Sequence, residues 1–148
     1  MNTTLLNIGE ESTFFSLPAI TLPLGYQRLA RESFRQKSPS AMDVEMAIAQ
    51  VADCIQATPA LRQTAHQAHC NDPWIIEIAR IAGSHSILTQ EQIERVFNRV
   101  ADVVSGSPKH EKEYPDEAEF ISYLIILREF SHHLGIADII WQKKNSTN

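Results

Sequence analysis

The feature that most constrains the fold of this chain is a nearly continuous apolar run between Asp116 and Gly135. Pro115 and the acidic residues that follow it suit the positive N-terminal end of a helix, and Gly135 suits the position just after its last turn. The sequence therefore predicts one long helix over this run, with a strong requirement for packing partners along it.

A helical wheel of this run shows two apolar faces. One face is the expected core face and carries Phe120, Tyr123, Leu124, Leu127, Phe130 and Leu134. Glu129 points away from that face, together with Ile125, Ile126, His132 and His133. Because a second apolar face requires a second partner, the pattern predicts contact with another element of the fold or with another subunit.

Helical periodicity and start or stop residues predict four further helices. Ser40 with Asp43, and Thr89 with Gln92, have the spacing of capping boxes. Residues 60–70 are alanine-rich and tolerate a helix, although they offer little to bury beyond Leu61. The four predicted helices span residues 23–36, 40–58, 73–82 and 89–105.

Two segments are predicted to be extended. Pro18 and Pro23 prevent a long helix over residues 14–24, and residues 136–141 form a short apolar run after Gly135. We expect the two segments to pair, because a lone strand leaves its backbone groups unsatisfied. The predicted fold class is mainly α: one domain over residues 1–148, a bundle of five to six helices with frayed tails at 1–13 and 143–148.

Composition excludes several classes of protein. The 148 residues are 43% hydrophobic, which suits one globular core. Their net charge of −5 argues against nonspecific electrostatic binding to nucleic acid or to anionic membranes. The longest apolar stretch, residues 123–127, is too short to cross a bilayer. The first basic residue is Arg28, which argues against a targeting segment, and only Cys54 and Cys70 are present. We therefore expect a cytoplasmic protein.

Histidine spacing suggests a possible metal site. Glu129 and His132 stand at the i, i+3 spacing by which helices present a carboxylate and an imidazole to one ion, and His66 and His69 repeat that spacing elsewhere. The alternative is that Glu129 pairs with His133 at i, i+4, while the histidines satisfy the last carbonyls of the helix. No cofactor is required, although a divalent metal fits this hypothesis.

A basic stripe suggests an anion site. Arg28, Arg31 and Arg35 share one side of the predicted helix 23–36 and suit phosphate groups, nucleic acid or an acidic partner. The alternative is a solvated face, or pairing with acids of the next helix such as Asp43, Glu45 and Asp53. Helices 73–82 and 89–105 loosely resemble a helix-turn-helix, but Glu91 and Glu94 on the second helix disfavour DNA binding.

No nucleotide-binding, nucleophile or metalloprotease motif is present in the sequence. The sequence-based interpretation is a non-enzymatic cytoplasmic protein, a homodimer or partner-binding protein that uses helix 116–134 as its contact. The predicted interface residues are Ile125, Ile126, Glu129, His132 and His133. The alternatives are a metal-dependent or small-molecule-binding protein, including a hydrolase, that uses Glu129, His132, His66 and His69, and an anion-binding protein that uses Arg28, Arg31 and Arg35.

Overall fold

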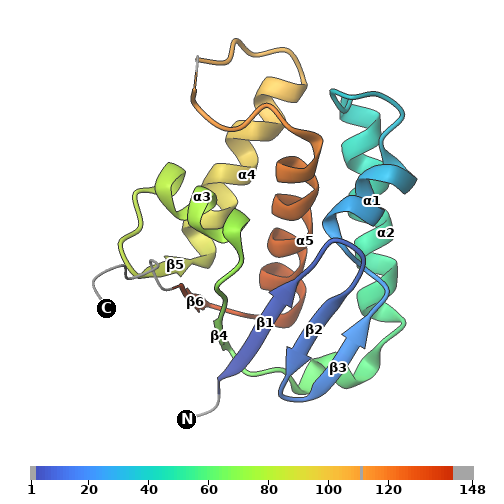
Figure 1. The fold of residues 1–148 in the computed structure, drawn as a ribbon, viewed down its shortest axis with the longest axis vertical. Helices are drawn as coiled ribbons and strands as arrows, with labels where there is room; N and C mark the ends of the chain where they lie inside the picture. Colours follow the sequence, from blue (N-terminus) through green and yellow to red (C-terminus); the bar gives the residue numbers. More distant parts are fainter. Residues whose placement is uncertain (1–2, 111, 142–148) are drawn as a thin grey trace.

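The computed structural model describes residues 3–110 and 112–141, and this part of the chain is an α/β fold (Figure 1). Six strands form one mixed sheet in the order β3-β2-β1-β4-β6-β5, accompanied by five α-helices. The predicted fold class, a mainly helical bundle, is wrong. Each strand is only three to five residues long, so its alternation is too brief to stand out in the sequence.

An antiparallel meander forms one side of the sheet. β1 spans Thr4–Ile8, β2 spans Thr13–Ser16 and β3 spans Ala19–Leu22. Residues alternate strictly between buried and exposed along β1, as expected for a strand with one face on the core. For residues 3–13 the prediction of a frayed tail is therefore wrong, because most of that segment is a paired strand and the turn that follows it. The tail predicted at residues 143–148 lies outside the described residues.

The other side of the sheet is mostly parallel. β4, at Gln67–His69, lies between β1 and β6 and is parallel to both, while β5, at Ile87–Thr89, is antiparallel to β6. The predicted C-terminal strand exists as β6, at Asp138–Ile140, but its partners are β4 and β5 rather than the N-terminal segment. Residues 60–70, whose composition tolerates a helix, form no α-helix, because a 3-10 turn at Pro59–Gln63 leads directly into β4.

The five helices lie close to their predicted positions. Both capping boxes are confirmed: Ser40 Oγ accepts a hydrogen bond from Asp43 N, and Thr89 Oγ1 accepts one from Gln92 N. The predicted stop at Gly135 is also confirmed, and its φ of 67° lies in the left-handed region that favours glycine. The helices are α1 Tyr26–Ser33, α2 Ala41–Gln56, α3 Pro73–Ala82, α4 Gln90–Val104 and α5 Ala118–Leu134.

Helix α5 forms the centre of the helical layer. It contacts α1, α2, α3 and α4, and Figure 1 shows it between α4 on one side and α1 and α2 on the other. Phe130 of α5 meets Phe15 of β2 edge to face, with ring centroids 5.1 Å apart. The hydrophobic core therefore runs from the inner face of the sheet through α5 to the outer helices. In the described residues, no helix is long and apolar enough to cross a membrane.

Candidate functional site

The carboxyl ends of the parallel strands β1 and β4 meet around Asp72, the residue that precedes α3. Its buried carboxylate accepts three hydrogen bonds: from Asn7 Nδ2 at 2.7 Å, from Ile8 N at 2.8 Å and from Tyr123 Oη at 2.7 Å. One buried charge thus joins β1, the start of α3 and the middle of α5. Since its acceptor sites are engaged by these donors, Asp72 positions the end of the sheet rather than carrying chemistry itself.

The groups behind Asp72 are kept neutral by burial. Burial is the largest cause of the raised pKa of the Tyr123 phenol and of the Cys70 thiol, and the Tyr123 oxygen lies 3.4 Å from the Cys70 sulfur. A thiol that is inaccessible and strongly held in its neutral form is a poor nucleophile. Cys70 is therefore part of the core.

The turn between β1 and β2, Gly9–Ser12, packs on the first residues of α1. The carbonyl of Gly9 accepts a hydrogen bond from Tyr26 N at 3.0 Å, and the carbonyl of Glu10 accepts bonds from Gln27 N and Arg28 N, also at 3.0 Å. A Cβ at Gly25 would lie 2.3 Å from the Glu10 carbonyl oxygen, so this approach requires glycine. The turn and the helix start are thus fixed against each other.

The same turn carries backbone donors without a protein acceptor. Within residues 3–110 and 112–141, the backbone N–H groups of Glu10, Glu11 and Ser12 donate no hydrogen bond to a protein atom. Consecutive backbone N–H groups in a turn are suited to bind oxyanions. The ends of strands in open α/β sheets are also the usual place for ligands. The turn is therefore the candidate functional site.

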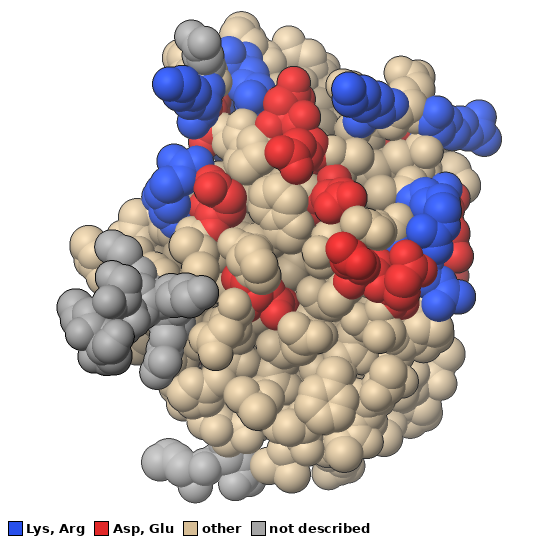
Figure 2. All heavy atoms as spheres, in the orientation of Figure 1, with Lys and Arg blue, Asp and Glu red and all other residues tan. Residues whose placement is uncertain are grey.

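Carboxylates surround this site. The Glu11 carboxylate pairs with Arg31 at 2.8 Å, and the hydrogen bond from Arg31 is the main cause of the lowered pKa of Glu11. Glu10 accepts a hydrogen bond from Gln27 Nε2 at 3.2 Å. Burial, followed by the charges of Glu10, Glu119 and Asp72, raises the pKa of Tyr26. Figure 2 shows the charged side chains of this face gathered in its upper part, whereas the lower part has none.

The residues predicted as a metal site are not assembled. Glu129 is buried and binds Arg128 Nη1 at 2.7 Å and His133 Nε2 at 3.0 Å, which is the alternative i, i+4 pairing, with Arg128 added. His66 Nδ1 lies 2.9 Å from the Gly135 carbonyl oxygen, and His69 is in β4 rather than on a helix. Among the described residues there is no group of three potential metal ligands, so Glu129, His132, His66 and His69 do not meet.

The predicted interface is covered within the monomer. Ile125 and Ile126 are 1% and 0% exposed, because α5 is surrounded by the other helices and the sheet. The second apolar face of this helix is therefore covered by other elements of the same fold. Of the two alternatives that the helical wheel left open, the contact is with the fold and not with another subunit. His132 and His133 are exposed and lie beside each other at the end of α5.

The predicted basic stripe is largely paired. Arg28 binds Glu32 at 3.3 Å in the same helix, and Arg31 binds Glu11 of the β1–β2 turn. Arg35 is exposed just after the end of α1, and its backbone N–H donates to Asp43 at 3.4 Å. The stripe is thus a solvated face whose arginines pair with acids. The acids are Glu11 of the turn and Glu32 of the same helix, not the predicted acids of the next helix.

Sequence reasoning missed the turn and the Asp72 hydrogen bonds. Asp72 directly precedes the predicted helix 73–82, but its three donors come from residues 51 to 65 positions away. A usable signal was the alternation of Thr4, Leu6 and Ile8 before Gly9, which is typical of a strand followed by a tight turn.

No protein-family model and no curated protein matches the chain. Solved structures do resemble it. The PPX-GPPA enzyme of Aquifex aeolicus matches with a TM-score of 0.74 and 16% identity, over 95% of this chain and 53% of that chain. The type II variant of the Aquifex aeolicus Ppx/GppA phosphatase matches with a TM-score of 0.73 and 15% identity, over the same shares of the two chains.

An exopolyphosphatase-like protein matches with a TM-score of 0.72 and 14% identity, over 97% of this chain and 56% of that chain. The chain therefore spans about half the length of these solved proteins. The identities establish a shared fold. The interpretation as a non-enzymatic helical interface protein is wrong. It rested on the absence of catalytic motifs and on an uncovered α5 face, whereas that face is buried and the chain has the α/β fold seen in Ppx/GppA phosphatases.

Proposed function

We propose that this chain acts on a phosphorylated substrate as a phosphatase-type domain, and that the β1–β2 turn binds a phosphate group. The observation that carries the proposal is the turn itself: the N–H groups of Glu10, Glu11 and Ser12 have no acceptor among the described residues, in a fold shared with Ppx/GppA phosphatases. Three N–H donors and the Ser12 hydroxyl match the oxygens of one phosphate group.

The surrounding residues have distinct roles in this proposal. Asp72 positions the turn through Ile8 N and Asn7, and Gly25 allows α1 to hold it from the other side. Glu10 is the carboxylate available to activate a water molecule, because its partner is the neutral Gln27. Glu11 is less suited to that role, because Arg31 binds both of its oxygens.

The cellular setting and the oligomeric state belong to the same proposal. Cys54 and Cys70 are free thiols in the structure, which fits a reducing cytoplasm. Since the solved proteins are about twice as long as the matched region, a partner domain or a second copy would complete the ligand cleft of this chain.

Phosphate release from pyrophosphate, tripolyphosphate and long-chain polyphosphate tests the proposed activity, measured with and without magnesium ions. We expect release to be saturable, and Glu10→Gln to lower kcat by about 100-fold, which is typical of removing a general base. Glu11→Gln is the matched control, because it removes the neighbouring, arginine-paired carboxylate and should retain most of kcat.

Ser12→Ala tests the binding role of the turn. Loss of one hydroxyl donor to a charged oxygen should raise KM by about tenfold, with a smaller change in kcat. Ser16→Ala, at the end of β2 away from the turn, is the control and should leave KM unchanged. Absence of phosphate release from all three substrates, together with no effect of pyrophosphate on the melting temperature, would refute the proposal.

A further inference from the structure

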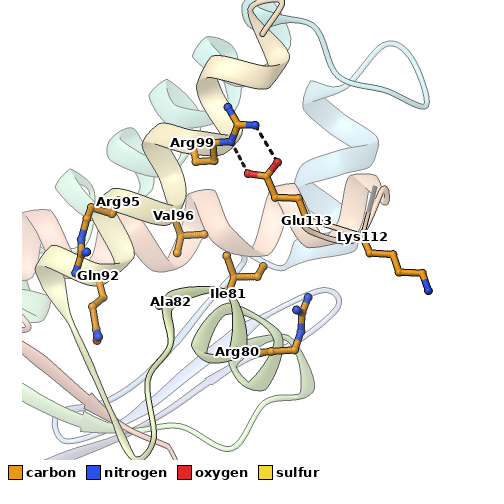
Figure 3. Close-up of a pocket in the computed structure, with 9 residues that line it drawn as sticks. All are labelled: Arg80, Ile81, Ala82, Gln92, Arg95, Val96, Arg99, Lys112 and Glu113. Atoms are coloured by element: carbon orange, nitrogen blue, oxygen red, sulfur yellow. Dashed lines mark hydrogen bonds and ion pairs between the residues drawn. The ribbon is translucent and has the colours of Figure 1, made fainter. Parts of the chain in front are cut away.

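A hollow of about 460 Å³ lies between α3, α4 and the loop that follows α4, away from the β1–β2 turn (Figure 3). Its floor is apolar and includes Val96, which is buried. Charged residues stand around this floor: Arg80 comes from α3, Arg95 and Arg99 come from α4, and Lys112 and Glu113 come from the loop. Figure 3 shows Arg95 and Arg80 on opposite sides of Val96 and Ile81.

The hollow is strongly cationic in an acidic protein. Four of its lining residues are positive and one is negative, whereas the whole chain has a net charge of −5. Arg95 and Arg99 also occupy i, i+4 positions of one helix, an arrangement of like charges that destabilises a helix by a few tenths of a kcal/mol. A bound anion would remove that cost and supply the missing negative charge.

The existing ion pairs leave part of this charge uncompensated. Arg80 binds Glu77 at 2.6 Å, but this pair is largely exposed and such pairs contribute little. Arg99 binds Glu113 through two nitrogens. The side chain of Arg95 makes no ion pair or hydrogen bond within the described part of the chain. The guanidinium groups of Arg95 and Arg80, on the two sides of the hollow, are therefore both able to bind an anionic ligand.

The contact between Arg99 and Glu113 shows which chemistry the hollow accommodates. The Glu113 carboxylate receives two hydrogen bonds from Arg99 and a third, at 3.1 Å, from His110 N. A planar guanidinium binds a phosphate in the same two-pronged manner. The Glu113 carboxylate is thus one oxyanion already bound at the edge of the hollow. The two other arginines, Arg80 and Arg95, lie on opposite sides of its floor.

We propose that this hollow is a second anion site, which binds a compact ligand with two phosphate groups through Arg95 and Arg80. Arg99 and Glu113 form the fixed edge of the site, and Lys112 lies at its rim. The site is separate from the β1–β2 turn and does not depend on the activity proposed for that turn.

Methylenediphosphonate is a suitable probe, because its P–C–P bridge cannot be hydrolysed. Amide chemical shifts during a titration report each site separately: residues Ile81, Ala82 and Val96 report the hollow, and residues Gly9–Ser12 report the turn. We expect saturable shifts at the hollow and at least a tenfold loss of affinity there in Arg95→Gln. Citrate, which carries carboxylates, should bind more weakly than the diphosphonate.

Arg62→Gln is the matched control, because Arg62 is an exposed arginine on the 3-10 turn. It changes the net charge equally and should keep the affinity. Absence of shifts at Ile81, Ala82 and Val96 in the unmodified protein would overturn the proposal, as would equal losses in Arg95→Gln and Arg62→Gln. Ser12→Ala should weaken binding at the turn by about tenfold and leave the affinity of the hollow unchanged, so failure of the turn site and failure of the hollow are distinguishable.

Discussion

Helices α4 and α5 are neighbours of similar length, yet they have opposite environments. α4 buries one stripe, formed by Ile93, Val96, Phe97 and Val100, and its other side is polar. α5 is buried almost all round, from residue 120 to residue 131 with the exception of Arg128. The difference teaches that a helical wheel reports which residues need cover, but does not say whether a second apolar face is covered by the same chain or by another.

The buried charge of α5 follows from its central position. Glu129 lies in the interior, where a carboxylate requires partners, and it finds Arg128 beside it and His133 one turn later. Arg128 also binds Glu94 of α4 through two nitrogens, at 3.0 Å each. Glu129, one of the predicted metal ligands, is therefore part of a polar network that joins the two helices through Arg128.

Introducing a charge on each helix is the strongest test of this comparison. Ile126→Glu places an unpaired carboxylate in the core, so we expect a loss of more than about 3 kcal/mol in the free energy of unfolding, measured in urea. Asn98→Glu adds the same charge on the exposed side of α4 and should stay within about 0.5 kcal/mol of the unmodified protein. Equal stability of the two variants would mean that the α5 face is accessible.

The second test removes one hydroxyl from α5. Tyr123→Phe leaves the buried Asp72 carboxylate with two of its three donors, so we expect a loss of about 1–3 kcal/mol in unfolding free energy. Tyr26→Phe is the control, since the Tyr26 ring packs on Tyr123 but its hydroxyl makes no hydrogen bond in the described residues. A loss in Tyr26→Phe as large as that in Tyr123→Phe would show that the effect does not depend on the hydrogen bond to Asp72.

A third test compares how the two helices begin. Thr89 caps α4 with its side chain, whereas Glu117, at the equivalent position of α5, makes no side-chain cap. Thr89→Ala should therefore cost about 1 kcal/mol in unfolding free energy, while Glu117→Ala should have little effect. Thermal unfolding of both variants measures the difference, and a larger loss in Glu117→Ala would contradict it.

The smallest effect concerns the loop between the two helices. The hydrogen bonds from Arg99 are the main reason that the pKa of Glu113 falls from 4.5 to about 2. A lowered pKa in the folded state stabilises the protein above pH 4.5, and this contribution is lost as the pH falls from 4.5 through 2. Melting temperatures between pH 6 and pH 2 should fall less steeply in Glu113→Gln, and Arg99→Gln should give the same flatter profile.

Features that depend on residues close in the sequence were predictable, whereas features that depend on distant residues were not. The capping pairs Ser40 with Asp43 and Thr89 with Gln92 were predictable, because each lies within one turn and involves only local backbone groups. β4 and β5 were not, because three residues give no periodicity and their pairing partners are distant in the sequence. The candidate site was missed for the same reason, since Asp72 joins segments that meet only after the sheet has formed.

By itself, the sequence determined the five helices, their caps, the long apolar run and the need for a second partner along it. Only the tertiary structure decided that this partner is the rest of the chain, that the strands form one sheet, and that arginines from α3 and α4 gather around one hollow. The physical reason is that helix formation depends on residues three and four positions apart, whereas strand pairing and burial depend on contacts across the whole chain.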